Sequence, residues 1–109
     1  MPVHYQASFY PSQAVALPGY HYRPYGRFCA LPSRHALGKR VAFAYKVGGH
    51  WQVQRGFLDA DICGTPGRLD LPVGVYRMLF GAEGVKRGLT PIRILSITGT
   101  AYRARRHHR

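Results

Sequence analysis

Apolar and polar residues alternate most regularly in the middle of the chain. Residues 41–47 read VAFAYKV, and large apolar side chains at every second position predict a β-strand. The pair Gly48-Gly49 follows, and residues 51–57 then alternate in much the same way. Two such runs around a Gly-Gly turn predict a β-hairpin with His50 and Trp51 near its tip.

Two later apolar runs predict further strands. Residues 73–80 (VGVYRMLF) predict a third strand. Residues 92–98 (IRILSIT) predict a fourth, and their nearly continuous apolar character favours a central place in the sheet. Between these runs, residues 81–91 are typical of a polar loop, which would carry Lys86 and Arg87.

The first third of the chain has a different composition. Residues 1–36 hold five of the eight prolines and five of the eight tyrosines, and prolines this frequent exclude a long helix. We therefore expect an extended arm rich in Pro and Tyr over residues 1–36, a β-rich core over residues 37–102, and a basic tail over residues 103–109. The fold class is mainly β, with a β-rich α+β fold as the alternative. It would be one small domain of four or five mostly antiparallel strands, forming a small barrel or a curved sheet.

The charge of the chain is both large and segregated. Sixteen Lys and Arg face four acids in 109 residues, which gives a formal net charge of +12. A chain of this kind attracts polyanions, and Arg, which outnumbers Lys thirteen to three, binds phosphate through its planar fork. A GC-rich genome would explain the Arg bias as well, but not the scarcity of acids. Residues 1–58 and 84–109 hold no acid, and the four acids are Asp59, Asp61, Asp70 and Glu83.

Basic and aromatic residues mark the candidate nucleic-acid contacts. Four Arg within residues 103–109 would neutralise several phosphates and release their counterions. Residues 20–28 interleave aromatic side chains with Arg and His, a pattern typical of surfaces on which unpaired bases stack. The same tyrosines would pack on the sheet in a purely structural role. The predicted phosphate contacts and stacking residues are Lys39, Arg40, Lys86, Arg87, Arg103, Arg105, Arg106, Arg109, Tyr22, Tyr25 and Trp51.

Catalysis is the alternative class of function. RNA cleavage without a metal needs a base, an acid and a cation beside the scissile phosphate. His50 with Arg55, or Tyr76 with Arg77, would supply parts of that set. Because a single His near a hairpin tip is more often an ordinary surface residue, we assign no catalytic residue, and a non-catalytic protein is the favoured interpretation.

A partial resemblance bears on this alternative. Residues 68–80, followed by residues 92–95, resemble the C-terminal strands of RelE/ParE-type toxins. Those toxins are small basic α+β domains, and some of them cleave RNA on the ribosome. The resemblance implies a toxin-like ribonuclease. The two N-terminal helices of that family have no counterpart here, because residues 1–36 are broken by proline.

The two cysteines predict neither a metal site nor a redox motif. Cys29 and Cys63 lack the CxxC spacing, and no second pair exists to complete a zinc site. We expect two buried free thiols, with a disulfide between them as the alternative. No cofactor is expected, since the chain holds neither GxxxxGK[ST] nor GxGxxG.

The carboxylates predict no metal site either. Asp59 and Asp61 would share one face of a strand, but two carboxylates without a third ligand bind a hard cation poorly. Residues 59–70 are rich in turn residues. We therefore interpret both carboxylates as turn residues, or as partners of Arg55 and Arg68.

Together these observations favour a small basic nucleic-acid-binding protein. RNA is favoured over DNA, and the protein would be a ribonucleoprotein component or a regulator that uses phosphate contacts and aromatic stacking. The alternatives are the toxin-like ribonuclease and a structural or inhibitory protein-interaction module in a ribonucleoprotein, a virion or a phage-type regulator. In such a module the Pro-rich arm would order against a protein partner.

The sequence also bears on location. No apolar run approaches the roughly 18 residues of a membrane span, so we expect no membrane partner. We expect an intracellular protein, with the cytoplasm favoured over an organelle matrix or a virion. The oligomeric state stays open.

Overall fold

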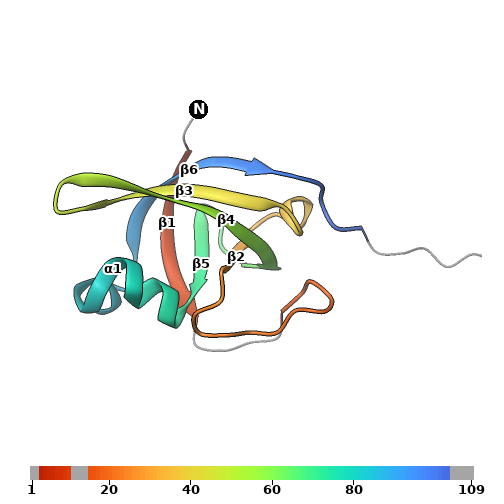
Figure 1. Ribbon diagram of the computed structural model, residues 1–109, viewed down its shortest axis with the longest axis horizontal. Helices are drawn as coiled ribbons and strands as arrows, with labels where there is room; N and C mark the ends of the chain where they lie inside the picture. Colours follow the sequence, from red (N-terminus) through yellow and green to blue (C-terminus); the bar gives the residue numbers. More distant parts are fainter. Residues whose placement is uncertain (1–2, 11–14, 104–109) are drawn as a thin grey trace, which may run out of the picture.

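The chain forms a six-stranded mixed sheet with one α-helix, as a computed structural model shows (Figure 1). The structure describes residues 3–10 and 15–103. A single turn of 3-10 helix, Arg34–Ala36, lies between the second and third strands. The elements are β1 (Val3–Tyr10), β2 (Phe28–Leu31), β3 (Arg40–Val47), β4 (His50–Ile62), β5 (Arg68–Pro72), α1 (Val73–Arg87) and β6 (Thr90–Thr98).

The pairings of the strands close into a ring. The order is β1-β5-β2-β4-β3-β6, and β6 also pairs with β1, so each strand has a neighbour on both sides. The pairs β1–β5 and β2–β4 are parallel, whereas the other four pairs are antiparallel. The prediction of a mainly β single domain is confirmed. The predicted sheet of four or five mostly antiparallel strands is corrected to a mixed sheet of six.

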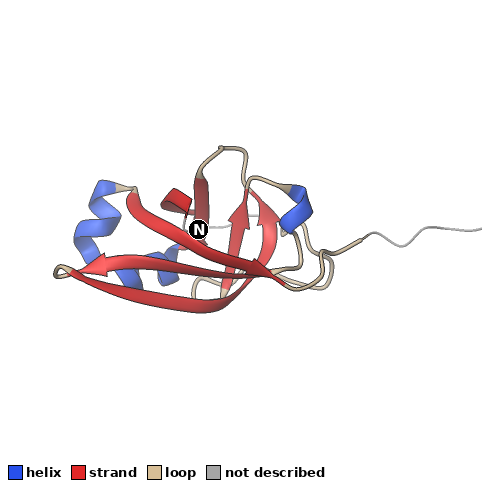
Figure 2. Ribbon diagram, turned by 90° about the horizontal axis from the view of Figure 1, so that it is seen from above, coloured by secondary structure: helices blue, strands red, loops and turns tan. Residues whose placement is uncertain are grey.

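The hairpin and the last strand agree with the sequence pattern. β3 and β4 pair in antiparallel register from Val47↔His50 onward, around the Gly48-Gly49 turn. Both glycines have positive φ, at 56° and 83°, as a turn between two paired strands requires. β6 lies between β1 and β3, the interior position that its apolar run predicts. Figures 1 and 2 show the hairpin as a long ribbon whose tip lies at the same end of the molecule as α1.

The predicted third strand is wrong, because residues 73–80 begin the helix α1. An unbroken apolar run fits a buried strand and a buried helix equally well. The burial pattern shows why the helix is adopted: Val75 and Tyr76, then Leu79 and Phe80, recur at helical spacing and pack on the core. Pro72 precedes the helix, where its fixed φ costs nothing.

The predicted loop over residues 81–91 is wrong for the same reason. The helix continues to Arg87 across a kink at Gly81, whose φ of 72° and ψ of −176° are not helical. Gly88 then ends the helix in the left-handed conformation, and its N–H donates to the Gly84 carbonyl at 3.0 Å. Lys86 and Arg87 therefore lie in the last helical turn, where cations interact favourably with the helix dipole.

Two stretches of the first 36 residues, Val3–Tyr10 and Phe28–Leu31, form β1 and β2, so a separate N-terminal arm is not confirmed. Residues 15–27, which precede β2, are joined to β4 and α1 by backbone hydrogen bonds. The N–H of Leu17 donates to the Ala60 carbonyl at 2.9 Å, and the carbonyls of Pro24 and Arg27 accept from Val75 and Leu58, each at 3.0 Å.

The core lies inside the ring of strands and under the helix. Its largest fully buried side chains are aromatic, and Tyr76, Phe43 and Phe57 lead them. A smaller apolar cluster around Leu58 lies on the other side of β4. Cys29 and Cys63 are buried free thiols, as expected. Burial, above all other causes, raises the pKa of both.

Candidate nucleic-acid interface

The outward side of β3 carries small and basic residues. Val41, Phe43 and Tyr45 point into the core, so Ala44 and Lys46, at the alternate positions, face the other way. Side chains of β4 and β6 meet over this outward side. We call this surface the basic face, and it comprises Arg40, Ala42, Ala44, Lys46, Trp51, Val53, Arg55, Arg93, Ser96 and Thr98.

Trp51 lies at one end of the basic face, and two cations, from β3 and β6, approach its ring. Lys46 is its direct partner across the hairpin, and the Lys46 Nζ lies 5.4 Å from the centroid of the Trp51 ring. From the other side of β3, the Arg93 Cζ lies 4.4 Å from the same centroid. The side chains of Arg93 and Trp51 are able to meet over β3 because Ala44, which pairs with Arg93, has only a methyl side chain. Trp51 is 44 % exposed, so part of its ring remains open to a ligand.

A groove of about 340 Å³ lies at the other end of the basic face. Arg40 and Arg55 line it, together with Ala42, Ser96 and Thr98. The pairings of β3 shift register here on both sides, toward β4 and toward β6, and bulges of this kind bend the sheet. The groove thus joins two guanidinium groups to two hydroxyl groups on a small-residue floor.

Three of the four acids are buried or half-buried, which leaves most of the positive charge uncompensated at the surface. Asp59 and Asp61 are buried in β4, and Asp70 is half-buried in β5. Glu83, on α1, is the one exposed acid of the four. A net charge of +12 is therefore carried on a surface with almost no carboxylate.

The basic residues predicted from the sequence are dispersed over the molecule. Arg40 lies in the groove, whereas Lys86 and Arg87 are exposed on α1. Lys39 is half-buried and Arg103 is exposed. The structure brings only Arg40 and Trp51 of the predicted set onto the basic face. The predicted contacts Arg105, Arg106 and Arg109 lie outside the described residues.

The two predicted stacking tyrosines lie elsewhere. The Tyr22 ring packs on Tyr10 at 5.2 Å between centroids, and its hydroxyl donates to the Tyr10 carbonyl at 2.8 Å. The same hydroxyl accepts from the Val73 N–H at 3.3 Å, so Tyr22 joins the segment to the sheet. Tyr25 is 65 % exposed, but its ring lies against Gly74 at the start of α1.

Sequence reasoning missed part of the basic face. Lys46, Arg55 and Arg93 were not among the predicted nucleic-acid contacts, although alternation along each strand places Lys46 and Arg93 opposite the apolar positions. Their meeting over Trp51 depends on the strand order, which no local pattern reveals.

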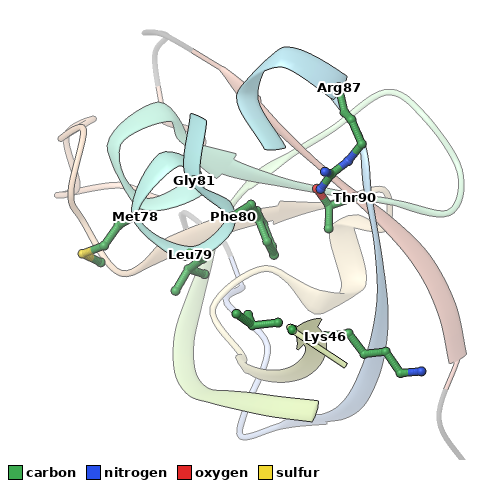
Figure 3. A pocket seen from close by; sticks show the side chains of 9 residues that line it. Lys46, Met78, Leu79, Phe80, Gly81, Arg87 and Thr90 are labelled. Carbon is green, nitrogen blue, oxygen red and sulfur yellow. The ribbon is translucent and has the colours of Figure 1, made fainter. Parts of the chain in front are cut away.

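A cleft of about 420 Å³ separates the hairpin tip from α1. Figure 3 shows Phe80 and Leu79 on its helical wall and Arg87 reaching toward Thr90. The Arg87 Nη2 donates to the Thr90 Oγ1 at 3.0 Å, and its Nε donates to the Leu89 carbonyl at 3.4 Å. Lys46 lines the opposite wall, and its ammonium points away from Phe80.

The residues considered for ribonuclease chemistry do not form a site. The Tyr76 side chain is fully buried, and its hydroxyl lies 2.9 Å from the Gly84 carbonyl and 2.8 Å from the Thr90 hydroxyl. Arg77, the next residue on the helix, is exposed. His50 and Arg55 are five positions apart on β4, so they point to opposite sides of the strand, some 16 Å apart at about 3.3 Å per residue.

The buried carboxylates form a separate polar cluster. The prediction that Asp59 is a turn residue or an Arg partner is wrong, because it lies within β4 and its Oδ1 accepts from the Leu31 N–H at 3.3 Å. The other oxygen of Asp59 is buried without a hydrogen-bond partner, and desolvation raises the pKa of the carboxyl to about 7. Asp61 also lies within β4, and its Oδ1 accepts from the Ile62 N–H at 2.9 Å.

Ser8 and Asp70 extend this cluster onto β1 and β5. The Ser8 hydroxyl donates to the Asp70 carboxylate. The pairings Ser8↔Asp70, Asp70↔Ala30 and Ala30↔Asp61 place these residues in one row across four adjacent strands. Among residues 3–10 and 15–103, no three His, Cys, Asp or Glu side chains are grouped so as to hold a metal ion.

The comparisons with known proteins assign no relative. No protein-family model matches the chain, and no curated protein matches it. Within the part of the chain that the structure describes, the helix is neither long nor apolar enough to cross a membrane.

Proposed function

We propose that the protein binds single-stranded nucleic acid, RNA in preference to DNA, through the basic face. The observation that carries this proposal is the half-exposed Trp51 beside Arg93 and Lys46 on a sheet surface without acids. Proteins that bind single strands combine aromatic platforms for bases with cations along the backbone path. The basic face offers both within one surface.

The two ends of the basic face suit two parts of a nucleotide chain. Trp51 offers a π-face to an unpaired base, and a stacked base contributes about 1–3 kcal/mol. Arg40 and Arg55 offer guanidinium forks to a backbone phosphate, with Ser96 and Thr98 as hydroxyl donors beside them. Lys46 and Ala42 lie four residues apart on β3, about 13 Å at 3.3 Å per residue. One extended single strand of nucleic acid is therefore able to reach both ends of the basic face.

Burial of the acids supports the same proposal. An exposed carboxylate near the basic face would repel phosphate and reduce the gain from counterion release. Asp59, Asp61 and Asp70 are held in the sheet instead, and Glu83 is on the helix. The surface charge therefore favours an anionic partner such as a polyanion.

Fluorescence of the single tryptophan tests the proposal. Trp51 is the only Trp of the chain, so a base stacked on it should quench emission as a short single-stranded RNA is added. We expect saturable quenching by the RNA, and weaker quenching by a duplex DNA of equal charge. Binding by anisotropy without any change in Trp51 emission would contradict the proposed use of this face.

A further inference from the structure

The cleft between the hairpin tip and α1 combines a fixed cation with an apolar wall. Arg87 is held by Thr90 and by the Leu89 carbonyl, so its guanidinium has a defined position before any ligand arrives. These two bonds use two of the five N–H donors of an Arg side chain. Further donors are thus available to an anion in the cleft.

The position of Arg87 depends on a buried hydroxyl network. The Tyr76 hydroxyl lies between the Gly84 carbonyl of α1 and the Thr90 hydroxyl of β6, and it joins the helix to the strand. Thr90 is only 5 % exposed and also accepts from Arg87. The cation is therefore built onto the rigid part of the fold, which is the condition for a preorganised site.

The helical wall of the cleft supplies an apolar surface for the uncharged part of a ligand. Leu79 and Phe80 line the cleft, and Val47 closes it from the hairpin side. The cleft volume of about 420 Å³ falls in the range of about 300–1,000 Å³ that is typical of small-molecule sites. No acid lines the cleft, so an anionic ligand meets no repulsion from its walls.

Lys46 connects the cleft with the basic face. Its side chain lines the cleft, while its Nζ lies 5.4 Å from the centroid of the Trp51 ring. Lys46 is thus the residue that the cleft and the basic face share. Figures 1 and 2 agree that the hairpin tip and α1 lie at the same end of the molecule.

We infer that this cleft binds one nucleotide unit, with the base against Leu79 and Phe80 and the phosphate on Arg87. The inference rests on the proposed function, because it takes the ligand from the strand bound on the basic face. It adds a base-binding pocket to a surface that otherwise offers only stacking and phosphate contacts. A free nucleotide has the same chemistry, and the experiment separates the two sources.

Titration calorimetry with adenosine monophosphate, ribose 5-phosphate and inorganic phosphate tests the inference on the full chain. We expect adenosine monophosphate to bind at least about tenfold more tightly than ribose 5-phosphate, because only adenosine monophosphate has a base that packs on the apolar wall. Arg87→Met should weaken the binding of adenosine monophosphate at least about tenfold. Arg77→Met removes the same charge from another exposed position of α1 and should leave binding unchanged. Equal binding of all three probes, or equal effects of the two variants, would overturn the inference.

Three further measurements complete the test. Arg87→Lys should keep part of the affinity if the charge matters, and the thermal midpoint of each variant shows whether it folds. A short single-stranded RNA that binds Arg87→Met several-fold more weakly identifies the strand as the source of the nucleotide. RNA binding unchanged by Arg87→Met, with adenosine monophosphate binding lost, identifies a free nucleotide instead. If RNA binds through Trp51 while adenosine monophosphate does not bind, the cleft inference fails and the proposed function stands. If neither binds, both fail.

Discussion

The guanidinium of Arg93 lies over the ring of Trp51, with its Cζ 4.4 Å from the ring centroid. The two residues come from β6 and β4, strands that β3 separates, and they meet across Ala44. A cation in this position orients the indole and adds positive charge beside the exposed part of the ring. The pair therefore combines an aromatic ring for a base with a positive charge for a phosphate.

Substitution of Trp51 should weaken RNA binding without unfolding the protein. We expect Trp51→Leu to lower affinity for a short single-stranded RNA about tenfold, because one stacked base contributes about 1–3 kcal/mol. Anisotropy of a labelled RNA measures the loss. Tyr25→Leu is the matched control, since Tyr25 is an exposed aromatic away from the basic face. An equal loss in both variants would show that Trp51 has no special role.

Neutralisation of the groove should change the salt dependence of binding. If Arg40 and Arg55 each hold one phosphate, Arg40→Gln and Arg55→Gln should each reduce the slope of log K against log[salt] by about 0.7. Arg77→Gln removes one exposed charge from α1 and should leave the slope close to that of the wild type. Slopes that fall equally in all three variants would mean that charge acts without a defined groove.

Asp59 should make stability depend on pH. Its folded-state pKa of about 7 exceeds the value of about 3.9 for an unfolded chain, so the folded protein holds more protons between these values. The free energy of unfolding therefore falls as pH rises from about 4 to 7. Asp59→Asn keeps an oxygen to accept from Leu31 and does not titrate.

Urea unfolding at pH 4.5 and pH 8 checks this expectation. Relative to the wild type, Asp59→Asn should gain on the order of 3 kcal/mol between the two pH values. Glu83→Gln serves as the control, because Glu83 is exposed and should show no comparable difference. A pH dependence that is the same in the wild type and in Asp59→Asn would contradict the raised pKa of this carboxyl.

Removal of the Tyr76 hydroxyl should destabilise the fold. Tyr76→Phe leaves the Gly84 carbonyl and the Thr90 hydroxyl without this buried partner, and we expect a loss of about 1–3 kcal/mol in the free energy of unfolding. Chemical denaturation measures it, with Tyr25→Phe as the exposed control. A variant as stable as the wild type would show that this network does not hold α1 to β6.

The sequence predicted the elements whose patterns are local. The alternation on both sides of Gly48-Gly49 is enough for the β3–β4 hairpin, because the side-chain period and the turn chemistry act within the same twenty residues. Residues 73–80 had no such support. Their apolar run fits a strand as well as a helix, and only packing of Tyr76 and Phe80 on the core decides for the helix.

Residue type alone identified two members of the basic face, but not the arrangement of that face. Trp51 and Arg40 were identified from residue type, but Arg93 joins them only through the order β4-β3-β6. The burial of Asp59 has the same origin, since it pairs with Cys29 of a strand thirty residues earlier. Contacts of this kind arise from long-range strand pairing, which composition and periodicity do not specify.

A salt titration of RNA binding tests most directly whether the basic face is the binding surface. The wild-type protein and a variant with Arg40, Arg55 and Arg93 each changed to Glu are titrated with a labelled single-stranded RNA and a duplex DNA of equal length. The wild-type protein should prefer the single strand and show a steep salt slope, and the variant should lose most of this preference and most of the slope. Unchanged RNA affinity and slope in the variant would contradict the basic face as the binding surface.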